Sequence, residues 1–235
     1  HYNSGQCEIL LTGNIDESVQ SILDEYLGGN DWKGNGGEIK KSDFRAFTTT
    51  EKEVFTPKQD AVQSSVRLGK LLFNKRHPDF PGMQVVNTIL GGYFGSRLMK
   101  KVREEKGYTY GIFSMMVPLV HEGYLTIASE VGAPVCRKAI DAIYQEIKRL
   151  RTEKVDQQEL DMVRNYMMGQ LLRAFDGPLP TASTYMSLME MGLDEDYYQR
   201  VVYTINNINP EDVRELAAKY LEEQDMIISI AGKCD

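Results

Sequence analysis

The sequence predicts an α+β fold in which helices pack on one face of a mainly antiparallel sheet. Three observations predict it. Apolar and polar residues alternate from Val62 to Leu68, which is typical of a strand with one covered and one solvated face. Two β-rich stretches, Tyr108 to Val117 and Tyr124 to Val131, flank a turn-like segment and predict a hairpin. Several longer stretches instead place their apolar residues at helical spacing.

The N-terminal part is predicted to form a strand, a helix, a loop and a second strand. The apolar run from Glu8 to Thr12 predicts the first strand, and Asn14-Ile15-Asp16 supplies capping residues for a helix from about Glu17 to Tyr26. The glycine-rich segment from Gly28 to Gly37 lacks the Gly-Lys-Ser/Thr ending of a phosphate-binding loop, so we expect an exposed loop. Residues Phe44 to Phe55 predict the next strand.

The central stretch predicts one amphipathic helix from about Gly82 to Glu105, which ends at Gly107. We expect Gly91 and Gly92 to let this helix approach the sheet closely, so a bulky residue at position 92 should destabilise the domain. The face expected to pack on the sheet consists of Val86, Ile89, Phe94 and Leu98.

The C-terminal part predicts helices followed by a closing strand. Two apolar stripes, Ile140 to Leu150 and Leu160 to Leu171, indicate helices that pack on the sheet. The Gly177-Pro178-Leu179-Pro180 segment breaks the second of them. Asn209-Pro210-Glu211 combines a cap, a first-turn proline and an acidic first turn. Two further helices are predicted from Thr184 to Met191 and from Glu195 to Ile205, and a strand from Met226 to Ile230.

Composition excludes several classes of function. The 235 residues are 42% hydrophobic and no linker-like segment interrupts them, so we expect residues 1–235 to form a single domain with a substantial core. The net charge is -7 with both signs interspersed, which argues against nucleic acid as a partner. No apolar run reaches the roughly 18 residues that a membrane-spanning helix needs.

Neither the cysteines nor the start of the chain identifies the cellular compartment. Cys7, Cys136 and Cys234 are odd in number and widely spaced, so we expect buried thiols rather than a disulfide framework or a zinc cluster. No signal peptide precedes the first strand, but the chain begins at His1 rather than at a methionine, and we expect it to be a piece of a longer protein. Both the bacterial cytoplasm and the periplasm remain candidates.

Arg103 and Tyr110 are the candidate site residues, and each also has an ordinary structural explanation. An arginine in the last turn of a helix commonly compensates the helix dipole, and a tyrosine at a strand start is commonly a core-edge aromatic. Two-residue periodicity places Tyr108, Tyr110 and Ile112 on one strand face, so Tyr108 is the alternative to Tyr110.

A family resemblance favours the functional explanation. Leu90-Gly91-Gly92, Ser96-Arg97-Leu98 and Arg103-Glu104, followed by Gly107 and Tyr110, resemble the signature of the C-terminal half-domain of the pitrilysin/insulinase metallopeptidases, especially the processing-peptidase-like branch. The order of elements is similar over nearly the whole chain, and the detailed motif covers about residues 76–112. The resemblance implies a processing-peptidase-like metallohydrolase half-domain.

The resemblance also implies a role for the pair. Arg103 and Tyr110 would be catalytic and substrate-binding residues that reach across a chamber to a peptide held at a zinc site on a different half-domain. Tyr108 is carried as a further substrate-binding candidate, although the family more often has an aliphatic residue at its position. The implied partners are a zinc-bearing half-domain or subunit and a peptide substrate.

The zinc motif itself is missing from this sequence. A zinc peptidase of this family needs an inverted H-x-x-E-H motif on a helix, and none of His1, His77 and His121 lies in such a pattern. Each histidine is expected at the surface or in a turn. We therefore expect no metal or other cofactor in this chain, zinc on the partner half-domain, and no peptidase activity from the chain alone. The alternative is a catalytically silent assembly or scaffold domain of the same fold.

Overall fold

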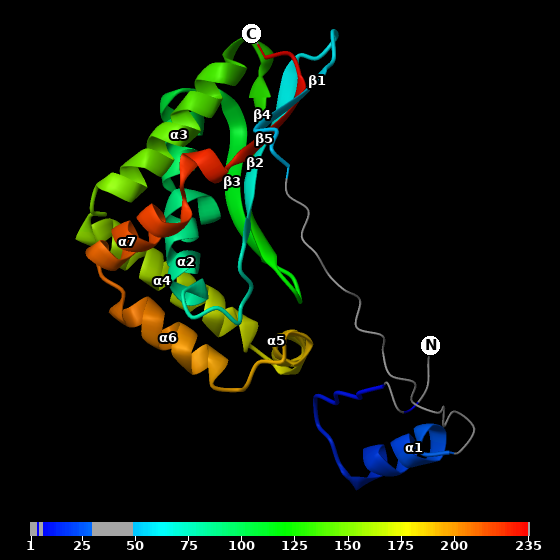
Figure 1. Ribbon diagram of the computed structural model, residues 1–235. Coiled ribbons are helices and arrows are strands. Elements are labelled where there is room, and N and C mark those ends of the chain that lie inside the picture. The colour runs from blue at the N-terminus through cyan, green and yellow to red at the C-terminus, as the bar shows by residue number, and fades with distance from the viewer. Residues whose placement is uncertain (1–3, 5–6, 30–48, 235) are drawn as a thin grey trace. The chain divides into compact units, whose positions relative to one another are not determined.

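The computed structural model describes residue 4, residues 7–29 and residues 49–234 (Figure 1). Their Cα positions group into two compact units, the first within residues 1–45 and 170–192 and the second within residues 46–169 and 193–235. The expectation of a single domain over residues 1–235 stays a prediction.

The described residues of the first unit include two complete helices and the end of a third. α1 (Glu17–Leu27) begins where the sequence predicts, because the Asp16 carboxylate accepts hydrogen bonds from the Ser18 and Val19 amides, at 2.9 and 3.3 Å. The predicted strand from Glu8 to Thr12 is wrong, since these residues form no regular element. A strand needs a neighbour for its ladder, and none of the described strands pairs with this run. α5 (Pro178–Met191) tolerates Pro178 at its first turn.

Two other N-terminal predictions fall partly outside the described residues. Residues 30–48 include most of the glycine-rich segment and the first part of the strand predicted from Phe44. The strand that the structure does contain here is β1 (Glu53–Pro57).

The second unit is built on a five-stranded sheet in the order β1-β5-β2-β4-β3. β1 pairs in parallel with β5, and the other three pairings are antiparallel, which confirms the predicted α+β fold with a mainly antiparallel sheet. β5 lies inside the sheet, whereas β3 and β1 are its edges. The remaining strands are β2 (Gln63–Leu72), β3 (Thr109–Pro118), β4 (Gly123–Gly132) and β5 (Ile227–Gly232).

Helices of this unit cover one face of the sheet (Figure 1). Ser64, Val66 and Leu68 of β2 are buried, while Arg67 is exposed on the other face, as the alternation predicts. One covering helix is α3 (Cys136–Thr152), which buries Ile140, Ile143, Ile147 and Leu150. The other helices are α2 (Phe80–Asn87), α4 (Gln157–Ala174), whose residues belong to both units, α6 (Tyr197–Asn207) and α7 (Pro210–Tyr220).

The cap of α7 follows the sequence prediction. The Asn209 side chain accepts hydrogen bonds from the Glu211 and Asp212 amides, and the Asp212 carboxylate accepts one from the Asn209 amide, which completes a capping box. Pro210 occupies the first helical position, where its missing N–H costs nothing. α7 and α2 pack against each other.

The continuous helix predicted from Gly82 to Glu105 is interrupted. α2 runs into a π-helical turn, η3 (Thr88–Gly92), and the chain then adopts an extended conformation at Tyr93 before a second π-helical segment, η4 (Met99–Glu105). Phe94 lies in the break and is 66% exposed, so its expected place on the packed face is wrong. Three glycines within five residues, in Gly-Gly-Tyr-Phe-Gly, disfavour continuous helix there.

Close approach to the sheet depends on Gly91 more than on Gly92. A Cβ at position 91 would lie 2.7 Å from both the amide nitrogen and the hydroxyl oxygen of Ser114 on β3. A Cβ at position 92 would meet Asn87 and Thr88 of the same helical segment, at 3.2–3.3 Å. Gly91 therefore lets η3 lie directly on β3.

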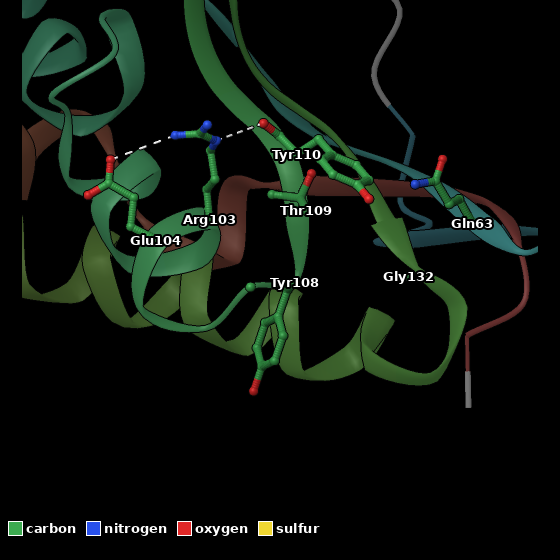
Figure 2. A pocket seen from close by; sticks show the side chains of 8 residues that line it. Gln63, Arg103, Glu104, Tyr108, Thr109, Tyr110 and Gly132 are labelled. Atoms are coloured by element: carbon green, nitrogen blue, oxygen red, sulfur yellow. Dashed lines mark hydrogen bonds and ion pairs between the residues drawn. The ribbon is translucent and has the colours of Figure 1, made fainter.

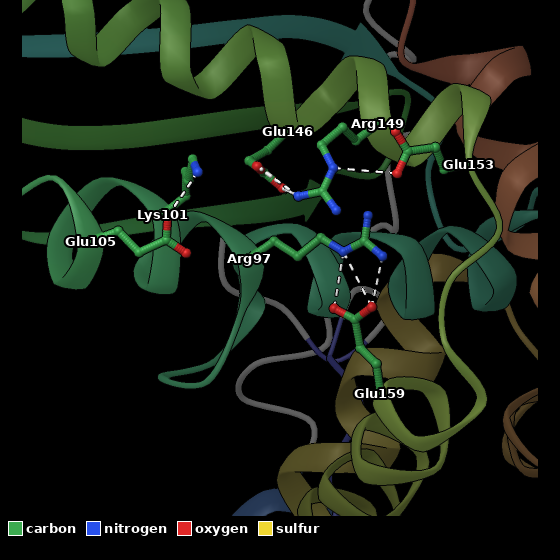
Figure 3. A network of polar contacts seen from close by, with 7 residues as sticks. All are labelled: Arg97, Lys101, Glu105, Glu146, Arg149, Glu153 and Glu159. Atoms are coloured by element: carbon green, nitrogen blue, oxygen red, sulfur yellow. Dashed lines mark hydrogen bonds and ion pairs between the residues drawn. The ribbon is translucent and has the colours of Figure 1, made fainter.

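An ion pair ties the segment between η3 and η4 to α4 (Figure 3). Arg97 of the Ser96-Arg97-Leu98 motif forms a bidentate ion pair with Glu159 of α4, through Nε at 3.0 Å and Nη2 at 2.7 Å. Their side chains are only 11% and 22% exposed. Arg97 thus anchors the start of the segment that carries Arg103.

A disulfide joins Cys136 at the start of α3 to Cys234 after β5, with the Cα atoms 5.1 Å apart. The expectation of buried thiols is wrong for this pair, and also for Cys7, which is a free but exposed thiol. Sequence spacing carried no signal because 98 residues separate the two bonded cysteines. Tertiary folding alone brings a helix start and a strand end together.

Candidate functional site

Arg103 lies on η4, near the end of the helical segment. Gly107 follows with φ at 65°, a left-handed conformation that side chains disfavour, and its amide donates to the Arg103 carbonyl at 3.1 Å. The Tyr108 amide donates to the Val102 carbonyl at 3.0 Å. This glycine stop is where the sequence predicts it, and it turns the chain directly into β3.

A β-bulge opens β3 at Tyr110. Thr109 pairs with Val131 and Ile112 pairs with Ser129, so Tyr110 and Gly111 together oppose the single residue Glu130. The bulge breaks the predicted alternation, since Tyr110 is 90% exposed and Ile112 is 1% exposed. Tyr110 is therefore not a core-edge aromatic.

The bulge and the helix end bring Arg103 and Tyr110 together, as the seven-residue spacing predicts. The Arg103 Nε donates a hydrogen bond to the Tyr110 carbonyl oxygen at 2.9 Å. The Arg103 guanidinium also lies over the Phe94 ring, 4.8 Å from its centroid. Its Nη1 atom lies 3.8 Å from a Glu104 carboxylate oxygen, too far for a hydrogen bond. Among the described residues, neither Nη atom has a hydrogen-bond partner.

Both candidate residues line one open pocket of about 540 Å³ beside the β3 edge (Figure 2). A second pocket of about 250 Å³ begins at Tyr110 on the same strand and extends over the exposed ion pair of Arg67 and Glu130. The lining of the first pocket is Gln63, Arg103, Glu104, Gly107, Tyr108, Thr109, Tyr110 and Gly132.

Tyr108 lies at the same pocket but in a different orientation. Figure 2 shows its phenol pointing away from the Arg103 guanidinium and from Tyr110. The predicted common strand face of Tyr108, Tyr110 and Ile112 is wrong, because the strand begins at Thr109 and the bulge follows immediately.

The described residues offer no metal site. No group of three or more histidine, cysteine, aspartate or glutamate side chains among them is placed to hold a metal ion. His77 stacks on Phe73 at 3.9 Å and its Nδ1 accepts a hydrogen bond from the Asp79 amide. His121 lies in the turn between β3 and β4, and His1 is outside the described residues.

Sequence reasoning missed three residues that shape this site. Phe94 was assigned to the core, although its glycine-rich surroundings signal a break in the helix. Thr109 and Ser129, whose hydroxyls contact the bulge, carried no signal, because a bulge depends on how β4 pairs with β3.

Comparison with known proteins decides the family. A family model described as "Peptidase M16 inactive domain" matches residues 1–167. The chain belongs to this family. The finding confirms the predicted resemblance and makes the chain an inactive M16 peptidase-like domain related to zinc proteases.

Curated relatives are similar over most of this chain, and a solved structure shares its fold. The chain is 26% identical to "Uncharacterized zinc protease YmxG" of Bacillus subtilis, over 95% of this chain and 53% of that protein. It is 22% identical to "Probable inactive metalloprotease YmfF" of the same organism, over 91% and 49%. A crystal structure of a peptidase M16 inactive domain from Pseudomonas fluorescens superposes with a TM-score of 0.70 at 24% identity, over 78% of this chain and 43% of that one.

The chain of this inactive M16 domain spans about half the length of the curated relatives it matches. None of its described helices is long and apolar enough to cross a membrane.

Proposed function

We propose that this chain is the non-zinc-binding half of a zinc-dependent endopeptidase, in which Arg103 and Tyr110 contact the peptide substrate. The observation that carries the proposal is that the Arg103 guanidinium and the Tyr110 phenol, both hydrogen-bond donors, line the same pocket. Tyr110 is 90% exposed, and the Arg103 Nε donates to the Tyr110 carbonyl, while the described residues offer its Nη groups no hydrogen-bond partner. A tyrosine kept only for packing would be buried.

The chemical role is electrostatic. Guanidinium and phenol groups donate to the carbonyl oxygen of the scissile peptide and bind it more strongly as negative charge develops there. The Phe94 ring and the Tyr110 carbonyl hold the guanidinium in one orientation, which lowers the reorganisation needed when charge appears. The described residues do not fit a zinc ion, so the metal that activates the attacking water would belong to the partner half-domain.

The partner is a zinc-bearing half-domain, in the parent chain or in a separate subunit. The relatives' greater length supports a longer parent protein, since the chain covers 53% of a protein named as a zinc protease. Reading the parent gene and its neighbour for the inverted zinc motif distinguishes these arrangements.

The test is peptide cleavage by the assembled enzyme. Arg103→Ala and Tyr110→Phe should each lower kcat/KM by roughly 10- to 1,000-fold, because each removes a donor to the developing oxyanion. Neither should unfold the protein, since both polar ends face the pocket. Matched controls are Arg200→Ala and Tyr203→Phe on α6, which lie outside this pocket and should cleave like the parent.

A scaffold role is the second candidate, because the relative YmfF is named a probable inactive metalloprotease. In a scaffold the two donors would be dispensable. Parental cleavage rates for both site variants would favour this candidate over a catalytic contribution.

A further inference from the structure

The bulge that exposes Tyr110 is held by two hydroxyl groups from neighbouring strands. Thr109 Oγ1 accepts a hydrogen bond from the Gly111 amide at 3.1 Å. It also lies 2.6 Å from the Glu130 carbonyl oxygen on β4 and 2.9 Å from the Gly111 carbonyl oxygen. Ser129 Oγ lies 2.9 Å from the Gly111 carbonyl oxygen and 2.9 Å from Thr109 Oγ1. Three backbone groups around the bulge, the Gly111 amide and the Gly111 and Glu130 carbonyls, therefore contact these two hydroxyls.

Each hydroxyl has one proton, which fixes how the contacts are shared. The arrangement that uses every group has Thr109 donating to the Glu130 carbonyl while it accepts from the Gly111 amide. Ser129 then donates to the Gly111 carbonyl. The extra residue of a bulge loses its ladder bonds, and here the two hydroxyls replace them.

Burial makes a hydrogen-bond partner important for Ser129. Ser129 is 4% exposed and faces the covered side of the sheet, where an unpaired hydroxyl is costly, and the Gly111 carbonyl accepts from it. Ile112, the next residue along β3 after the bulge, is 1% exposed and fixes the register of the rest of the strand. The stretch from Thr109 to Gly111 is thus the part that can change its pairing.

The bulge sets the direction of both ends of Tyr110. Its carbonyl accepts from the Arg103 Nε at 2.9 Å, and its phenol projects into solvent. A regular ladder would shift the pairing of this stretch by one residue, and each such shift moves a side chain to the other face of the sheet. Without the bulge, the hydrogen bond from the Arg103 Nε to the Tyr110 carbonyl, which orients Arg103, would be lost.

We propose that Thr109 and Ser129 are positioning residues, whose hydroxyl pair fixes the β3 bulge and thereby the geometry of Tyr110 relative to Arg103. The inference rests on the proposed function of that pair. Thr109 lines the same pocket, but the role proposed for the two hydroxyls is not substrate binding. They act through the backbone of Gly111 and Tyr110.

Thr109→Val and Thr109→Ser separate the hydroxyl from the shape of the side chain. Valine keeps the branched shape and the strand preference of threonine but removes the hydroxyl, and serine keeps the hydroxyl. Thr109→Val should lower kcat of the assembled enzyme by roughly 10- to 100-fold with little change in KM, because misplaced groups cost rate. Thr109→Ser should stay within about 2- to 3-fold of the parent, and Ser129→Ala should behave like Thr109→Val.

A second readout does not depend on activity. In ¹H–¹⁵N spectra of the full protein, the Arg103 Nε–H and Gly111 amide signals should both move in Thr109→Val and Ser129→Ala and stay in place in Thr109→Ser. Ser114→Ala is the matched control, since Ser114 is a buried β3 hydroxyl that donates to the Asn87 carbonyl at 3.2 Å, away from the bulge. It should leave both signals and kcat unchanged.

Three outcomes would overturn the inference. Unmoved signals in both Thr109→Val and Ser129→Ala would show that the hydroxyls do not hold the bulge. Equal losses of kcat in Thr109→Val and Thr109→Ser would show that the hydroxyl is not the cause. If Thr109→Val kept the parental kcat while Tyr110→Phe was impaired, the position of Tyr110 relative to Arg103 would not depend on the Thr109 hydroxyl. If Tyr110→Phe itself cleaves at the parental rate, the proposed function fails, and the two signals still decide whether the hydroxyls hold the bulge.

Discussion

At the scale of single residues, backbone irregularities decide what the site residues can do. Tyr110 would alternate with its neighbours in a regular strand, but the bulge exposes 90% of it while Ile112 is buried. Arg103 sits where a helix-dipole cation is common, yet its Nε binds a carbonyl on the next element. The sequence predicts the pair as a candidate site, and the structure supplies its geometry.

Gly91→Ala tests the close packing of η3 on β3. The new Cβ would lie 2.7 Å from the Ser114 amide nitrogen, a backbone atom that cannot move without shifting the strand. We expect a loss of about 1–3 kcal/mol in the free energy of unfolding, measured by urea denaturation.

Gly92→Ala is the matched variant for this test. Its Cβ would meet Asn87 and Thr88 at 3.2–3.3 Å, which small shifts within the helix can relieve, so the loss should be smaller. A larger substitution at position 92 should still destabilise the protein. An equal or greater loss for Gly92→Ala than for Gly91→Ala would refute the assignment of the close contact to Gly91.

At the scale of elements, side chains at helix ends fix how helices meet. The Asp79 carboxylate, just before α2, accepts hydrogen bonds from Lys219 Nζ at 2.8 Å and from the Tyr220 hydroxyl at 2.5 Å, both at the end of α7. Burial raises the pKa of the Asp79 carboxyl, but these two hydrogen bonds and the Lys219 charge outweigh it, so its pKa lies below the usual value.

The lowered pKa of Asp79 predicts an acid-dependent contribution to stability. The contribution is fully present above the pKa of the unfolded chain, about 3.9, and is lost as the pH falls through the lower pKa of the folded state. Asp79→Asn should therefore be less stable than the parent at about pH 6, and the difference should shrink on acidification toward about pH 2 to 3.

Urea denaturation at a series of pH values measures this difference in unfolding free energy. Tyr220→Phe keeps Lys219 but removes one hydrogen bond to Asp79. Its unfolding free energy should therefore depend on pH less than that of the parent and more than that of Asp79→Asn. A difference between Asp79→Asn and the parent that is constant over this pH range would mean that the two hydrogen bonds do not favour the ionised carboxylate.

At the scale of the whole molecule, one covalent link joins segments that are remote in sequence. The bond between Cys136 and Cys234 joins the end of β5, the last strand in the chain, to the start of α3. Such a link restricts the unfolded chain more as the enclosed loop grows, and here the separation is 98 residues.

Loss of this disulfide should lower stability substantially. Cys136→Ser combined with Cys234→Ser, or reduction of the parent, should cost about 2–4 kcal/mol and lower Tm by roughly 5–15 °C. Cys7→Ser is the control, because Cys7 is a free exposed thiol and its loss should leave Tm unchanged. A parent that melts identically with and without reductant would contradict the stabilising role of the bond.

The sequence by itself determined the α+β class, the hairpin, the caps of α1 and α7, the glycine stop and the family. These features depend on local periodicity, capping chemistry and motif spacing, and all of these involve residues that are close together in the sequence. The sequence also identified Arg103 and Tyr110 as the candidate pair, through a seven-residue spacing that spans one turn between two elements.

Only the tertiary structure decided the features that depend on a partner element. The Glu8 to Thr12 run forms no strand because no described strand pairs with it, and Phe94 is exposed because the helix breaks among glycines. The disulfide required α3 and β5 to meet. The bulge at Tyr110 required the β4 hydroxyl of Ser129 and the exact pairing of two strands, which no local pattern encodes, because register is set by which residues the core buries.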